Sequence, residues 1–210
     1  MATDRTAVIG FPVDHSLSPT IHNHWIKELG LNTKPYEKIN VDPNKFEEQI
    51  NNLKAEGYGG LNVTVPLKEL AFSISDETSS VSKKLKSVNT LSLNSEKIDG
   101  DNTDAVGFIN SLDEKTIENN ITNKKTLVLG AGGSARSVVY ALNELGGHVR
   151  LFNRTPEKAE ILLDDLSINP SPVGAEELDD YANSSSFIVN TTSLGQKAGE
   201  HNNILSFESI

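Results

Sequence analysis

Small polar side chains gather in several short segments of the first half of the chain, and their chemistry indicates what they bind. The segments read H-S-L-S-P, N-V-T-V-P-L-K, V-N-T and D-N-T-D. Hydroxyl and amide groups hydrogen-bond to hydroxyl and carboxylate oxygens, and one lysine and one aspartate add charge. We therefore predict a binding site for a hydroxylated carboxylic acid, formed by Ser16, Ser18, Asn62, Thr64, Lys68, Asn89 and Asp104.

Within this set, Lys68 and Asp104 are the candidates for acid–base chemistry. An ammonium group beside a reacting oxygen can move a proton, and a carboxylate can hold and polarise that ammonium. Each residue also has an ordinary interpretation, because most lysines lie on protein surfaces and an aspartate in a first helical turn complements the helix dipole. Ser18 in turn is suited to cap the helix that follows it. The joint pattern, rather than any single residue, carries the prediction.

A glycine-rich turn in the second half predicts a nucleotide site, because it follows an apolar run and opens into a helix-like segment. Gly130 permits a tight turn, Gly132 lets the backbone approach a pyrophosphate, and Ala135 keeps the helix close to the strand. The anion would lie on unpaired N–H groups at the positive end of the helix dipole. The residues predicted to bind the cofactor here are Gly130, Ala131, Gly132, Gly133, Ser134 and Ala135, together with Thr191.

The residues after the next apolar run favour NADP over NAD. Chains that bind NAD usually carry an acid about 20 residues past the glycine turn, where it binds the ribose 2′-hydroxyl. This chain has Arg154 there, and a guanidinium can bond a 2′-phosphate through two donors. The alternative is that Arg154 is an ordinary exposed arginine after a strand. The predicted residues of this part of the cofactor site are Asn153, Arg154, Thr155 and Lys158.

Strand-like and helix-like segments alternate along the whole chain, which predicts an α/β architecture. In the first half, the predicted strands cover 6–11, 36–41, 61–65 and 88–93, and the predicted helices cover 19–29, 43–56 and 103–112, with Ser18 and Asp42 as caps. In the second half, the predicted strands cover 126–129, 148–152 and 187–190, with a weak one near Val173, and the predicted helices cover 134–145 and 156–166.

The polar segment 113–125 has almost no periodicity and is the predicted domain boundary. We therefore expect a substrate-binding and catalytic domain over 1–112 and a Rossmann-like NADP-binding domain over 113–210. The segment 196–210 is polar and adds none of the further strands that a dinucleotide-binding sheet carries. We expect either a chain shortened at its C-terminus or a partner that covers the exposed sheet edge.

Composition excludes several classes of function. The chain has 210 residues and no cysteine, so it has no disulfide framework and no thiolate metal site. A net charge of −10 disfavours binding to nucleic acid or anionic membranes. Three of the five histidines, His15, His22 and His24, are close in sequence but lack the spacing of metal ligands, so we predict no metal. With no long apolar stretch in the sequence, we expect a cytoplasmic protein that binds a small molecule; a homodimer stays open.

The order and spacing of these motifs resemble those of the shikimate dehydrogenase family. The matching segments are G-F-P-V-D-H-S-L-S-P-T-I-H-N from Gly10, N-V-T-V-P-L-K from Asn62, V-N-T from Val88, G-D-N-T-D-A-V-G from Gly100, G-A-G-G-S-A-R from Gly130, and N-R-T from Asn153. They extend over nearly the whole chain. The resemblance implies two domains with the active site between them, and reversible NADP-linked reduction of 3-dehydroshikimate to shikimate in aromatic amino-acid biosynthesis.

The resemblance also implies a role for each polar residue of the first half. Ser16 and Ser18 would hold the substrate carboxylate, and Lys68 would give or take a proton at the reacting oxygen, coupled to Asp104. The residues that would bind the ring hydroxyls are Asn62, Thr64, Asn89 and Asp104.

The chain departs from the family pattern in two places. Lys86 and Ser87 stand where the family usually has a small glycine–alanine turn, and family members continue for roughly another 60 residues that carry further substrate and nicotinamide contacts. Three alternatives therefore stay open beside NADP-dependent shikimate dehydrogenase. They are a quinate/shikimate dehydrogenase that uses NAD, a binding protein that keeps the pockets without turnover, and a shortened chain that does not fold stably.

Overall fold

The fold comes from a computed structural model that describes residues 5–94, 96–169, 171–192 and 194. The polar segment 196–210, on which the expectation of a shortened sheet rests, lies outside the described residues. The chain forms two compact units, Met1–Thr103 and Asp104–Ile210. This division precedes the helix at 104–110, whereas the sequence places those residues in the first domain. In the part of the chain that the structure describes, no helix is long and apolar enough to cross a membrane.

The first unit is built on a mixed six-stranded sheet with the order β2-β1-β3-β5-β6-β4. The central strands β1, β2 and β3 are parallel, β5 runs antiparallel to β3, and β6 runs antiparallel to β5. The carboxyl ends of β1, β2, β3 and β6 therefore meet the amino end of β5 at one edge. The strands are β1 (Arg5–Gly10), β2 (Glu37–Asn40), β3 (Tyr58–Val63), β4 (Glu77–Thr78), β5 (Thr90–Leu93) and β6 (Ile98–Asp101).

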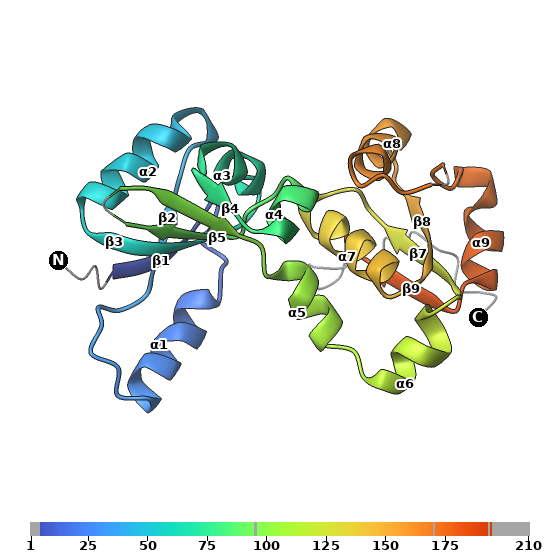
Figure 1. The fold of residues 1–210 in the computed structure, drawn as a ribbon, viewed down its shortest axis with the longest axis horizontal. Coiled ribbons are helices and arrows are strands. Elements are labelled where there is room, and N and C mark those ends of the chain that lie inside the picture. The colour runs from blue at the N-terminus through green and yellow to red at the C-terminus, as the bar shows by residue number, and fades with distance from the viewer. Residues whose placement is uncertain (1–4, 95, 170, 193, 195–210) are drawn as a thin grey trace. The chain divides into compact units, whose positions relative to one another are not determined.

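Helices cover both faces of this sheet (Figure 1). Ala7 and Ile9 of β1 pack into the core that α2 and α3 complete, whereas Val8 points the other way, toward the small cluster of α1. This alternation follows the two-residue period of a strand. The helices of the unit are α1 (Ser18–Glu28), α2 (Phe46–Ala55), α3 (Lys68–Ile74) and α4 (Ser80–Leu85), with a 3-10 turn, η1 (Pro43–Lys45), before α2.

Several predicted elements of the first unit are confirmed and one cap is wrong. Helix α2 buries Phe46, Ile50 and Leu53, as an apolar stripe at helical spacing requires, and Asp42 caps the 3-10 turn before it through the N–H of Asn44. Ser18 is not a cap: it is the first residue of α1, and its own N–H donates to Oγ of Ser16 at 3.3 Å.

The second unit contains a parallel three-stranded sheet with the order β8-β7-β9. Its strands are β7 (Lys125–Leu129), β8 (His148–Phe152) and β9 (Phe187–Asn190). The weak strand expected near Val173 does not form within the described residues 171–174. A single bond from the N–H of Val173 to the carbonyl of Leu151, at 2.9 Å, still holds that segment beside β8. Numbered in chain order, β7, β8, this segment and β9 are the first to fourth strand positions, and they lie side by side in the order 3-2-1-4 of a doubly wound dinucleotide fold.

The helices of the second unit lie on both faces of its sheet. Val128 of β7 belongs to the core formed with α7 and α8, and its neighbours Leu127 and Leu129 belong to the opposite core with α9. The expected boundary segment 113–125 is partly helical, and Ile121 within it is fully buried. The helices are α5 (Asp104–Asn110), α6 (Glu114–Thr116), a π-helical turn η2 (Ile117–Ile121), α7 (Gly133–Glu144), α8 (Pro156–Asp165), a 3-10 turn η3 (Ala175–Glu177) and α9 (Leu178–Ser184).

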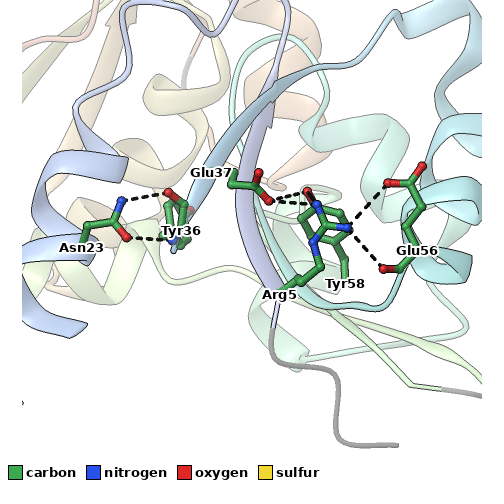
Figure 2. A network of polar contacts seen from close by, with 6 residues as sticks. All are labelled: Arg5, Asn23, Tyr36, Glu37, Glu56 and Tyr58. Atoms are coloured by element: carbon green, nitrogen blue, oxygen red, sulfur yellow. Dashed lines mark hydrogen bonds and ion pairs between the residues drawn. The ribbon is translucent and has the colours of Figure 1, made fainter. Parts of the chain in front are cut away.

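A polar cluster ties the amino ends of the central strands of the first unit together (Figure 2). The hydroxyl of Tyr58 on β3 donates to a carboxylate oxygen of Glu37 on β2 at 2.6 Å, and Arg5 on β1 donates to both at 3.2 and 2.8 Å. The hydrogen bond from Tyr58, and then Arg5, lowers the pKa of Glu37. Burial and the bond to Glu37 raise the pKa of Tyr58 to about 12.

We predict that Tyr58→Phe lowers the free energy of unfolding by about 1 kcal/mol at pH 7, because it removes a hydrogen bond to a carboxylate. The pKa of Glu37 is lowered in the folded state, so the ionised carboxylate stabilises the fold. This stabilisation is fully present above the ordinary glutamate pKa of about 4.3 and is lost as the pH falls through the lowered pKa. Urea unfolding of both proteins from pH 7 to pH 3 checks this. If the difference in free energy of unfolding between the two proteins stays constant or grows as the pH falls, Tyr58 does not stabilise the fold through the ionised carboxylate of Glu37.

Candidate functional site

The predicted polar residues that belong to the first unit lie at the carboxyl edge of its sheet or next to it. Asn62 is on β3 between the buried Leu61 and Val63, so its side chain projects to the α1 face of the sheet. Thr64 follows β3, and Asn89 precedes the antiparallel strand β5. Residues from distant parts of the sequence therefore converge because the sheet order and strand directions bring them together.

A series of hydrogen bonds begins at Tyr36, just before the amino end of β2, and passes through β3 and β5 to Thr103 after β6. The hydroxyl of Tyr36, beside β2, donates to Oδ1 of Asn62 at 2.6 Å, and Nδ2 of Asn62 lies 3.4 Å from Oγ1 of Thr90. The hydroxyl of Thr90 donates to Oδ1 of Asn89 at 3.0 Å, and Nδ2 of Asn89 donates to Oγ1 of Thr103 at 3.0 Å. Asn62 and Asn89, both predicted site residues, are therefore held in one oriented network.

The segment after β1 comes very close to the segment after β3. A Cβ atom on Gly10 would lie 2.6 Å from Cγ2 of Thr64 and 3.2 Å from the carbonyl oxygen of Val65. Beyond this contact, the N–H of Ser16 donates to the carbonyl of Val13 at 3.0 Å and closes a turn. The turn leads directly into α1, so the predicted carboxylate ligands Ser16 and Ser18 lie just before the helix and at its first residue.

The two residues predicted to move protons lie in different units. Lys68 is the first residue of α3 and half-buried, and its carbonyl accepts from the N–H of Val88 at 3.0 Å, which places it beside the segment that carries Asn89. Asp104 is the first residue of α5 and is half-buried in the second unit. It directly follows Thr103, the last member of the hydrogen-bonded series.

The glycine turn of the second unit follows β7, the strand from which the chain continues first to one side of the sheet, at β8, and later to the other side, at β9. Gly130 follows β7 with φ at +101°, a backbone conformation that favours glycine, and a Cβ on it would lie 2.9 Å from Oγ1 of Thr191 after β9. Strands β8 and β9 flank β7 on opposite sides. Ligands of open α/β sheets bind at such a switch point, outside the carboxyl ends of the strands.

The start of α7 has the features that an anion site needs. Gly132 precedes the helix, and among the described residues no side chain caps it and no atom lies within 4 Å of where its Cβ would be. Ala135 is fully buried against β7, which keeps the helix close to the strand. Helix N–H groups at such an end bind phosphate oxygens, so these residues fit a dinucleotide pyrophosphate.

The residues predicted to bind the 2′-phosphate lie beside this turn. Oδ1 of Asn153 accepts from the N–H of Ala131 at 3.2 Å, and its Nδ2 donates to the carbonyl of Thr155 at 2.8 Å. Asn153 therefore joins the turn after β7 to the turn after β8. Arg154 and Lys158 are exposed and bring two positive charges to this edge, so the donor set fits a phosphorylated ribose.

Sequence reasoning missed Tyr36 and left the partners of Thr90 and Thr103 unassigned. Tyr36 is predicted only as the start of a strand, yet it is buried and bonded to Asn62. Its contact spans 26 positions of sequence. No local pattern signals such a pair, because it depends on β2 and β3 lying on either side of β1.

These features define a class: a two-unit α/β protein whose second unit has the strand, glycine turn and helix of dinucleotide-binding proteins. Residues 8–91 match the family described as shikimate dehydrogenase substrate binding domain, and residues 111–204 match the family described as shikimate / quinate 5-dehydrogenase. An NADP-dependent shikimate dehydrogenase of Methylocella silvestris is 40% identical over 196 residues, which are 93% of this chain and 70% of that protein.

Solved structures agree with the sequence comparisons. Shikimate dehydrogenase from Aquifex aeolicus has a TM-score of 0.84 at 39% identity, over 96% of this chain and 73% of that one. The Thermus thermophilus enzyme, solved in complex with NADP(H) and shikimate, has a TM-score of 0.76 at 33% identity, over 91% of this chain and 69% of that one. The chain therefore belongs to the shikimate dehydrogenase family, and the predicted fold class is confirmed.

We predict that Gly132→Ala weakens NADP binding at least about tenfold while costing less than about 1 kcal/mol of stability. The new methyl group finds open space in the protein but occupies the side from which a pyrophosphate approaches. Titration with NADP and urea unfolding check the two effects. Gly130→Ala is the contrasting variant, because its strained φ should cost about 2 kcal/mol. Unchanged NADP affinity in Gly132→Ala would exclude the turn as the pyrophosphate site.

Proposed function

We propose that this chain is an NADP-dependent oxidoreductase that reversibly reduces 3-dehydroshikimate to shikimate, a step of aromatic amino-acid biosynthesis. The observation that carries the proposal is the oriented series of hydroxyl and amide groups at the edge of the first sheet. It occurs in a chain that is 33% identical to an enzyme solved with NADP(H) and shikimate. A polyhydroxylated ring acid offers the hydroxyls that such groups bind.

The substrate site is proposed to divide into a carboxylate end and a hydroxyl end. Ser16 and Ser18, at the start of α1, would bind the carboxylate with hydroxyl and backbone donors. The amides and hydroxyls along the sheet edge would bind the ring hydroxyls. The proposed residues of this second group are Asn62, Thr64, Asn89 and Asp104.

The reacting oxygen requires a proton source, and Lys68 is proposed to supply it. When bound, reduced NADP supplies a hydride to the carbonyl carbon of the substrate. Negative charge then develops on the carbonyl oxygen, and the ammonium of Lys68 stabilises it and gives up one proton to form the hydroxyl. Asp104 would hold that ammonium in place. In the reverse direction, neutral Lys68 takes the proton back from the hydroxyl.

The nucleotide is proposed to bind along the carboxyl edge of the second sheet. The turn before α7 would hold its pyrophosphate, and Arg154 with Lys158 would bind its 2′-phosphate. The proposed cofactor residues are Gly130, Ala131, Gly132, Gly133, Ser134, Ala135, Asn153, Arg154, Thr155, Lys158 and Thr191.

The direct test is the initial rate of shikimate oxidation by the 210-residue chain with NADP and then with NAD, followed by the absorbance of the reduced nicotinamide. Turnover with NADP supports the proposed substrate and cofactor together. Absence of turnover with either cofactor would contradict the proposed activity for this chain.

The cellular setting is proposed from composition. The net charge of −10 disfavours nucleic acid and anionic membranes as partners, and we propose a cytoplasmic protein whose ligands are small molecules. That the chain forms a homodimer stays a prediction, and sedimentation velocity of the purified chain measures its oligomeric state.

We predict that Lys68→Ala lowers kcat by about 10²–10⁴-fold, the range for loss of a general acid–base group, with little change in NADP affinity. The matched control is Lys83→Ala, which removes an exposed lysine from α4 of the same unit. Steady-state kinetics with both substrates separates the effects. Equal losses of turnover and NADP affinity would remove the proton-transfer role from Lys68.

We predict that Arg154→Ala reduces the preference for NADP over NAD by about 10- to 100-fold, which corresponds to a charged hydrogen bond of about 1.5–3 kcal/mol. NAD lacks the 2′-phosphate, so kcat/KM with NAD serves as the internal control. An unchanged ratio of the two kcat/KM values would show that Arg154 does not read the 2′-phosphate.

A further inference from the structure

Helix α1 holds Tyr36 by both its backbone and its ring. Nδ2 of Asn23 donates to the carbonyl of Tyr36 at 2.9 Å, and the N–H of Tyr36 donates to Oδ1 of Asn23 at 2.8 Å (Figure 2). The ring of His22 stacks on the tyrosine ring at 4.2 Å between centroids, with 12° between the planes. The position of Tyr36 is therefore specified by the same helix that begins at Ser18.

The hydroxyl of Tyr36 is directed at the amide of Asn62. Tyr36 is only 5% exposed and packs with Val8 and Val13, so its surroundings disfavour a phenolate. Burial raises the pKa of Tyr36 above its ordinary value. The phenol therefore keeps its proton, and in the structure it donates that proton to Oδ1 of Asn62 at 2.6 Å.

An asparagine amide has one acceptor end and one donor end, so fixing one fixes the other. With its oxygen bonded to Tyr36, Asn62 turns its NH2 group to the side of Thr90, 3.4 Å away. An NH2 group carries two N–H donors, and the second is then available to an oxygen of a ligand on the α1 face of the sheet.

We propose that Tyr36 is a positioning residue that sets the orientation of the Asn62 amide, so that Asn62 presents an N–H donor to a ring hydroxyl of the substrate. The inference rests on the proposed function for the identity of that substrate. Tyr36 acts through Asn62 and does not itself touch the substrate. Without the phenol hydroxyl, the amide can rotate and present its oxygen for part of the time.

The test is Tyr36→Phe, which keeps the ring and its stacking and removes only the hydroxyl. We expect the KM for shikimate to rise about 5- to 20-fold, with kcat and the KM for NADP changed less than about twofold, because a hydroxyl contact away from the reacting carbon contributes equally to ground state and transition state. Adding Tyr36→Phe to Asn62→Ala should cause no further rise, since the two residues act as one unit.

Tyr58→Phe is the matched control. Tyr58 is also a buried tyrosine of this unit with a hydrogen-bonded hydroxyl, but its bonds lie at the amino ends of the strands. It should leave the KM for shikimate unchanged while lowering stability. A KM within twofold of wild type in Tyr36→Phe, or equal KM increases in both variants, would overturn the inference.

A measurement without ligand separates this inference from the proposed function. The side-chain amide resonances of Asn62 in a ¹⁵N–¹H spectrum should shift in Tyr36→Phe and stay in place in Tyr58→Phe. Unshifted resonances in Tyr36→Phe would overturn the inference whether or not the chain oxidises shikimate. Shifted resonances in a chain that neither binds nor oxidises shikimate would support the positioning of Asn62 and contradict only the proposed function.

Discussion

The close approach of the chain after β1 to the chain after β3 is the constraint on which the polar edge of the first unit depends. Gly10 occupies the point of contact, where any Cβ would collide with Thr64 and crowd the backbone of Val65. The methyl group of Thr64 would have to move aside and the carbonyl of Val65 would have to shift by a few tenths of an ångström, so a larger residue here displaces the segment after β3. Because the two segments meet there, the serines at the start of α1 and the polar residues after β3 share one edge.

In the second unit, too, the turns beyond the carboxyl ends of the strands pack together, but there the close contact depends on the backbone conformation of a glycine. Gly130 takes a left-handed conformation and leaves room for Thr191, so the turns after β7 and β9 can pack together. Asn153 then links the turn after β7 to the turn after β8. In both units the strands provide a rigid base and the turns beyond their carboxyl ends carry the chemistry, which is the general arrangement of open α/β sheets.

Local sequence patterns predict the elements whose burial repeats at a regular spacing, such as helix α2 and the apolar strand β7. Strand β6 is not predicted, because I-D-G-D has no apolar run and the strand forms through its pairing with β5. The residues of the candidate site also fall into two groups, those that sequence motifs predict and those that they do not. Motif spacing predicts the residues that would touch ligands, such as Asn62 and Lys68, because their types already suggest the chemistry. The residue that orients Asn62, Tyr36, is selected instead by a tertiary contact across the sheet.

The cluster of Arg5, Glu37 and Tyr58 fastens β1, β2 and β3 at the end of the sheet opposite the polar edge. The residues that join these strands to one another therefore lie at their amino ends, and the residues proposed to bind ligand lie toward their carboxyl ends. The bonds among Arg5, Glu37 and Tyr58 involve none of the polar residues at the carboxyl edge, so substitution of Asn62 or Asn89 leaves these bonds between the strands in place. A change in ligand preference at the carboxyl edge can therefore arise without removing the hydrogen bonds that join β1, β2 and β3 at their amino ends.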